Sequence, residues 1–98
     1  MSHPVRLLPE AKAEFDAAAD WYEQQRAGLG VDFVTHVREV LNRISAHPQL
    51  HPMVYGDVRK AVVRKFPYVV FYREEAGEVV VIAVFHAARD PAIWQSRV

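Results

Sequence analysis

The side chains with the greatest chemical capacity in this sequence are one histidine, one tyrosine and three arginines. They are His86, Tyr68, Arg59, Arg64 and Arg89. Cleavage of RNA needs a group that takes the 2′-hydroxyl proton, a group that stabilises the scissile phosphate and an acid for the leaving oxygen. An imidazole suits the proton transfers and guanidinium groups suit the phosphate. If the protein is a nuclease, its expected catalytic residues are His86, Arg59, Arg89 and Tyr68.

A structural role for His86 competes with this catalytic one. His86 follows a long apolar stretch and precedes Arg89-Asp90-Pro91, a sequence typical of a turn. An imidazole in that place can simply hydrogen-bond the turn. The sequence favours this second interpretation, and it therefore predicts no catalytic residue.

The remaining histidines give no metal-site pattern. His47 and His51 lie four residues apart, but Pro48 and Pro52 disfavour a helix that would present them together. There is no Ser/His/Asp order and no glycine-rich phosphate loop. We expect neither a metal nor a cofactor.

Length and composition predict one small domain over residues 1–98. Apolar residues make up 51% of the chain, which is enough for a core, and cysteine is absent, which excludes disulfides. The N-terminal residues and the strand-length apolar stretches predict neither a signal peptide nor a membrane span, so we expect a cytoplasmic protein. Twelve basic residues balance twelve acidic ones, a balance that argues against strong direct binding of nucleic acid.

Two amphipathic helices are expected in the first half of the chain. Pro9 suits a first helical turn, and an apolar stripe then recurs at helical spacing up to Tyr22. Trp21 lies on the flank of this stripe. Gly28 and Gly30 indicate a tight turn, and a second stripe runs from Phe33 to a stop near residues 47–48. The two helices should form a hairpin.

Strands are expected around this hairpin. Residues 5–8 suit a short first strand, and residues 58–65, 68–72 and 79–85 suit three later ones, with a loop at 48–56 and a tight turn at 74–78. The order β-α-α-β-β-β predicts an α+β domain with the helical hairpin on an antiparallel sheet. The basic residues of 58–65 are consistent with a charged edge strand.

The strands at 68–72 and 79–85 are apolar without alternation. A sheet with one solvated face should alternate apolar and polar residues, so both faces of these strands are expected to be buried. Two helices can cover one face. The other should meet the C-terminal segment, which Trp94 could anchor, or a partner chain.

Several segments in this order resemble the ParE/RelE toxin superfamily, and its ParE branch more closely. The first half contributes Ala18-Ala19-Asp20-Trp21-Tyr22-Glu23, then Gly28-Leu29-Gly30 and Phe33. The second half contributes Val58-Arg59, Phe66-Pro67-Tyr68-Val69-Val70-Phe71-Tyr72, His86-Ala87-Ala88-Arg89-Asp90-Pro91 and Trp94.

The resemblance implies a toxin of a type II toxin–antitoxin system, held in a hetero-oligomer by a ParD-like antitoxin whose C-terminal segment wraps it. ParE-type toxins poison DNA gyrase by binding, and RelE-type toxins cut messenger RNA in the ribosome. RelE-like nucleases tend to be strongly basic, whereas this chain is neutral with three lysines. The leading hypothesis is therefore a gyrase inhibitor. The alternatives are a ribosome-dependent endoribonuclease and an inactive module that only binds its antitoxin.

Under this hypothesis the aromatic and basic residues divide into two expected surfaces. Arg89, Trp94 and Arg97 are the expected target-binding residues. The expected antitoxin-binding residues are Trp21, Arg59, Arg64, Phe66 and Tyr68.

Overall fold

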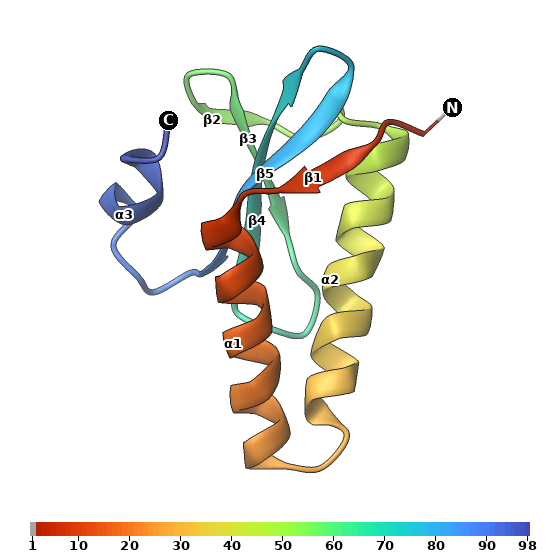
Figure 1. Ribbon diagram of the computed structural model, residues 1–98, viewed down its shortest axis with the longest axis vertical. Helices are drawn as coiled ribbons and strands as arrows, with labels where there is room; N and C mark the ends of the chain where they lie inside the picture. The colour runs from red at the N-terminus through yellow and green to blue at the C-terminus, as the bar shows by residue number, and fades with distance from the viewer. Residues whose placement is uncertain (1) are drawn as a thin grey trace.

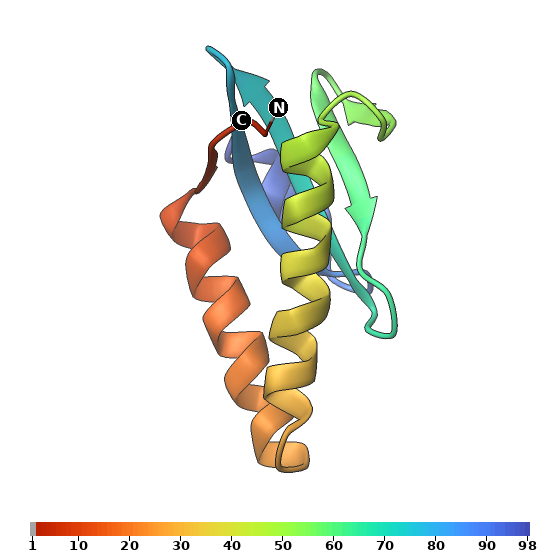
Figure 2. The ribbon, with the colours of Figure 1, turned by 90° about the vertical axis from the view of Figure 1, so that its right-hand side faces the viewer.

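The computed structural model describes residues 2–98 as two long helices on one face of a five-stranded sheet (Figures 1 and 2). A third, short helix lies apart from the helical pair, toward the C-terminus. The elements are β1 (Val5–Leu7), α1 (Pro9–Gln25), α2 (Leu29–Ala46), β2 (Met53–Tyr55), β3 (Val58–Val62), β4 (Tyr68–Glu75), β5 (Glu78–His86) and α3 (Ala92–Gln95). The predicted α+β fold with a helical hairpin is confirmed.

The connection between α1 and α2 depends on two glycines and one carboxylate. Gly28 adopts a left-handed conformation with φ of 88°, which side chains with a Cβ rarely tolerate. Both carboxylate oxygens of Glu23 accept backbone N–H bonds at 2.9 Å, one from Gly28 and one from Gly30. A Cβ on Gly30 would lie 2.6 Å from the carbonyl oxygen of Ala19, so only glycine permits this approach of the two helices.

The strand order is β1-β5-β4-β3-β2, and β1 runs parallel to β5 while the other neighbours are antiparallel. The central pair is β4 and β5, joined by the tight turn Ala76-Gly77, in which both residues have positive φ. β5 contains one extra residue, because Tyr72 pairs with Val81 whereas Phe71 pairs with Ala83. This bulge turns Ala83 to the same face as Ile82.

Two expectations about the sheet edge were wrong. Residues 48–56 are not a loop throughout, because Met53–Tyr55 form the edge strand β2. β3 therefore lies inside the sheet, and it ends at Val62 before a turn in which Lys65 has φ of 69°. The basic residues at 58–65 do not protect an edge. The edge strand on this side of the sheet, β2, exposes all three of its residues, none of them charged.

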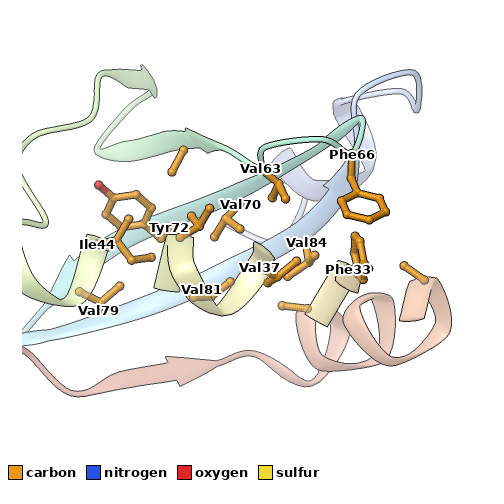
Figure 3. Packing of buried hydrophobic residues seen from close by; sticks show 14 residues of the cluster. Phe33, Val37, Ile44, Val63, Phe66, Val70, Tyr72, Val79, Val81 and Val84 are labelled. Carbon is orange, nitrogen blue, oxygen red and sulfur yellow. The ribbon is translucent and has the colours of Figure 1, made fainter. Parts of the chain in front are cut away.

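The helix-side core fills the space between the helical pair and the sheet (Figure 3). Phe33 is fully buried at its centre, with its ring 5.2 Å from that of Phe66 and 5.0 Å from that of Tyr68. Farther along, the buried Tyr72 hydroxyl donates a 2.6 Å hydrogen bond to the Pro48 carbonyl, and burial raises the pKa of Tyr72 to about 12. The core thus also fixes the chain leaving α2.

The opposite side of the sheet, called here the far face, carries a second and smaller core. Its buried members come from β3, β5 and α3: Val58, Val80, Ile82, Ala83, Phe85 and Trp94. Trp94 is 2% exposed and stacks on Phe71 with ring centroids 4.1 Å apart. This confirms that both faces of β4 and β5 are buried, with the C-terminal segment anchored by Trp94 on the second.

Candidate functional surface around the end of β5

The second half of β5 has an edge without a strand neighbour. β1 pairs with β5 only at Val79–Val81, so the chain beyond Val81 has unpaired backbone groups on that side. Side chains satisfy two of them. The Val84 N–H donates to the Glu14 carboxylate at 3.3 Å, and the Ile82 carbonyl accepts from Arg97 at 3.1 Å. Charged groups thereby occupy an edge that would otherwise be open to pairing.

Glu14 links α1 to the residues on either side of α3 through a group called here the Glu14 clasp, which comprises Glu14, Arg89 and Arg97. Arg97 makes two bonds to the carboxylate, at 2.8 and 2.9 Å, and Arg89 makes one at 3.1 Å. Side-chain exposure is low for Glu14 and Arg97, at 13% and 12%, and is 44% for Arg89. The hydrogen bond to Glu14 raises the pKa of Arg97, although burial opposes it. The clasp thus connects the segments before and after α3 to α1.

A groove of about 360 Å³, the α1 groove, lies between α1 and the ends of β4 and β5. Its walls combine small residues of α1 with aromatic and polar groups: Ala13, Glu14, Ala17, Ala18, Trp21, Tyr68, Val84, His86 and Arg89. Trp21 is 56% exposed beside it. Burial is the main cause that raises the pKa of the Tyr68 phenol. The groove can accept an apolar group next to hydrogen-bonding ones.

Three of the four residues expected in a nuclease meet in this groove. The rings of Tyr68 and His86 are 5.2 Å apart, and Arg89 lines the same walls. Arg59 is elsewhere, because it pairs with Tyr72 in the sheet and its guanidinium donates to the His51 carbonyl at 2.7 Å. Four residues of strand separate Tyr72 from Tyr68, which is about 13 Å. The expected quartet is not assembled as one site.

His86 also has the structural contact that the sequence favoured. Its Nδ1 accepts a 3.0 Å hydrogen bond from the Ala88 N–H, within the turn that leads to α3. The proton of the neutral imidazole then resides on Nε2. The ring therefore fixes the direction in which the chain leaves β5.

The residues expected to contact a target differ in accessibility. Arg89 is half-exposed, with its guanidinium carbon 4.4 Å from the centroid of Phe85. Trp94 is buried against Phe71, so the expectation of an exposed target contact there needs correction. Arg97 is held by Glu14 and offers little surface. In this arrangement Arg89 is the member of the three that a target can reach.

The residues expected to bind an antitoxin are likewise dispersed. Trp21 and Tyr68 share the α1 groove, and Arg64 is exposed in the turn after β3. Phe66 is 8% exposed and packs in the helix-side core, so it cannot be an antitoxin contact in this conformation. Arg59 holds the chain before β2. The sequence did not distinguish the buried Phe66 from the exposed Trp21, which is 56% exposed.

Glu14 is the residue of this candidate surface that the sequence analysis did not single out. It lies three residues after Ala11 and four before Ala18, both of which are buried. A carboxylate beside the apolar stripe of a helix signals a buried partner, because its desolvation otherwise costs free energy. The partners themselves lie 75 and 83 residues away in the chain, so that signal could not have identified them.

Residues 2–98 lack the features of two other classes of site. No group of three or more His, Asp or Glu side chains converges there as metal ligands would. Within the same residues, no helix combines the length and apolar character that a membrane crossing requires.

The fold resembles that of a known structure. A solved structure described as "Chromosomal ParDE TA system from P. aeruginosa" superposes with a TM-score of 0.65 at 15% identity, covering 87% of this chain and 96% of the other. That likeness shows a shared α+β fold. No curated protein matches the chain.

The family itself follows from the sequence. The family model described as "ParE toxin of type II toxin-antitoxin system, parDE" matches residues 5–91, from β1 to the turn before α3. The chain belongs to this family, and it is a ParE-like toxin of the type II class.

Proposed function

We propose that this toxin poisons DNA gyrase by direct contact and that a cognate antitoxin neutralises it. The observation that carries the proposal is the family match, which extends through Arg89 and Pro91 at the accessible end of β5. Gyrase is the target that the resemblance to ParE-type toxins implies. The half-exposed Arg89, on a protein without net charge, supplies a localised cation for such a contact.

Contact, rather than catalysis by the toxin, is the mode that the geometry supports. Arg59 lies away from His86 and Tyr68, and the Arg89 guanidinium already shares a carboxylate with Arg97. A phosphate-stabilising role requires donors free to meet charge as it develops. The α1 groove and the adjoining turn instead present a preformed surface.

The first test is a supercoiling and cleavage assay with purified gyrase, ATP and the toxin free of antitoxin. We expect linear, gyrase-linked DNA to accumulate. Arg89→Ala should require about tenfold more protein for the same effect, which corresponds to about 1.4 kcal/mol of binding free energy. Arg38→Ala is the matched control, because Arg38 is an exposed arginine on α2.

The outcomes separate the alternatives. If folded toxin leaves the activity of the purified gyrase unchanged, that gyrase is not a target of the toxin. Expression without antitoxin that leaves cells unharmed would identify an inactive binding module. Equal effects of Arg89→Ala and Arg38→Ala would remove Arg89 from the target surface.

A ribosome-dependent endoribonuclease is the second candidate, favoured by the approach of Tyr68, His86 and Arg89 around one groove. It predicts cleaved transcripts in cells that express the toxin. His86→Ala should abolish the cleavage while circular dichroism shows an intact fold. Cleavage that persists in this variant would exclude His86 as the proton-transfer group.

A further inference from the structure

A second hollow, the far-face pocket, lies behind the end of β5 on the side opposite the α1 groove. Its floor is apolar and comes from Val69, Phe71, Phe85 and Trp94, and its rim includes Lys60 and Arg89. Its volume is about 130 Å³. An apolar cavity of about 150 Å³ takes one benzene ring, so this pocket suits a single aromatic or branched aliphatic side chain.

Apolar surface continues around the pocket because α3 is too short to cover the far face. Val62 is 57% exposed, and it pairs across the sheet with the floor residue Val69. Ile93 of α3 is 41% exposed, and Tyr55 of the edge strand is 45% exposed with its ring 5.6 Å from that of Trp94. Contiguous apolar surface of this kind marks interaction sites.

The charges at the rim have one sign. Lys60 is exposed and forms no ion pair within residues 2–98, and no carboxylate lines the pocket in that part of the chain. Arg89 shares Glu14 with Arg97, yet its guanidinium also lies over the Phe85 ring. A protein with no net charge thus concentrates two cations around an apolar hollow. Complementarity requires an occupant with negative charge and an apolar anchor.

We propose that the far-face pocket binds an acidic peptide segment, which inserts one apolar side chain onto Phe71 and Trp94 and places a carboxylate near Lys60. The segment belongs to the antitoxin, so this inference rests on the proposed function. The surface differs from the one expected from sequence. Among the residues expected to bind the antitoxin, neither Trp21 nor Tyr68 lines this pocket.

Trp94 provides the readout once Trp21 is replaced, because the chain contains two tryptophans. The probe is a blocked hexapeptide with a central leucine–phenylalanine pair between acidic residues, titrated into the Trp21→Phe toxin. We expect a saturable change in Trp94 emission. A peptide with the same acidic residues around glycine and serine, and one with lysines around leucine and phenylalanine, should each bind at least tenfold more weakly.

Charge variants in the same Trp21→Phe background test the rim. Lys60→Glu should weaken binding of the acidic peptide about tenfold and improve binding of the basic one, and Val62→Asp should weaken the acidic peptide several-fold. Arg38→Glu makes the same charge change on α2, on the other side of the sheet, and should leave both affinities unchanged. Raising the salt concentration should weaken the acidic peptide, because the rim is exposed.

Several results would overturn the proposal. These are equal binding of the acidic and basic peptides, equal effects of Lys60→Glu and Arg38→Glu, or a thymidine octanucleotide that binds where the acidic peptide does not. The gyrase assay does not involve these peptides. Peptide binding without gyrase poisoning would therefore exclude gyrase as the target and support the far-face pocket as a peptide-binding site. Gyrase poisoning without peptide binding would support gyrase as the target and exclude this peptide-binding site.

Discussion

The two faces of the sheet differ in how completely they are covered. Helices of 17 and 18 residues close the helix-side core, in which Phe33, Val37 and Ile44 have no exposed surface. The far face is covered only in part, by a helix of four residues with one stacked indole, and Val62 and Ile93 remain exposed there. In a small domain, buried area determines stability, so the helix side should stabilise the fold. The incompletely covered side is the one that carries the far-face pocket.

The largest effect should come from the centre of the helix-side core. Phe33→Ala removes a fully buried ring that contacts Phe15, Tyr22, Phe66 and Tyr68. We expect a loss of about 3–5 kcal/mol in the free energy of unfolding, measured by urea denaturation. Val31→Ala, at a residue 69% exposed on the same helix, should change it by less than about 0.5 kcal/mol.

Trp94→Ala should cost less, about 2–3 kcal/mol, and should act locally. The indole is buried in the smaller core, but α3 is a single turn held by Trp94 and by the Glu14 clasp, so it can detach without global unfolding. Hydrogen exchange of residues 92–97 should accelerate while that of α2 is unchanged. A loss equal to that of Phe33→Ala would show that the two faces contribute alike.

Glu14→Gln tests the clasp between the two faces. The amide keeps the size of the side chain but removes the charge shared by Arg89 and Arg97, and we expect a loss of about 1–2 kcal/mol. Asp16→Asn is the matched change on α1, because its pair with Lys12 is exposed and should contribute about 0–0.5 kcal/mol. Similar melting temperatures for both variants would mean that the clasp adds no stability.

The smallest effect concerns pH and belongs to the helix side. Burial, followed by the positive charges of Arg43 and Arg59, lowers the pKa of His51 in the native state. The unfolded chain then binds more protons just below its own histidine pKa of about 6.5, so stability should fall as the pH decreases through that value. His51→Gln should flatten the dependence of the melting temperature on pH between about 7.5 and 5. An unchanged slope would show that His51 does not contribute to this pH dependence.

The local sequence pattern predicted those elements that bury one continuous apolar stripe of a helix or one continuous apolar strand. The helical spacing from Ala11 to Tyr22 and from Phe33 to Ile44 predicted α1 and α2, because a 3.6-residue period is visible in the sequence itself. The strand β2 escaped detection. Three residues after two prolines carry no period, and their strand conformation depends on pairing with β3.

The candidate site likewise divides into features that the sequence predicted and features that it did not. Arg89, Trp94 and Arg97 were expected to contact a target because of their residue types and their place in the C-terminal segment, but the sequence did not predict their exposure. Whether an arginine is free or paired depends on a carboxylate that can lie anywhere in the chain. Here that carboxylate is Glu14, at the opposite end.

The sequence by itself determined the helical hairpin, the doubly buried strands, the absence of disulfides and the family, because each is recorded in composition, period or motif order. Only the tertiary structure decided that β1 joins β5 in parallel, that β2 forms the edge and that Glu14 binds two distant arginines. It also decided that Trp94 is an anchor and not an exposed contact. These features depend on which segments meet in space, and the free energy of such contacts has no counterpart in local sequence.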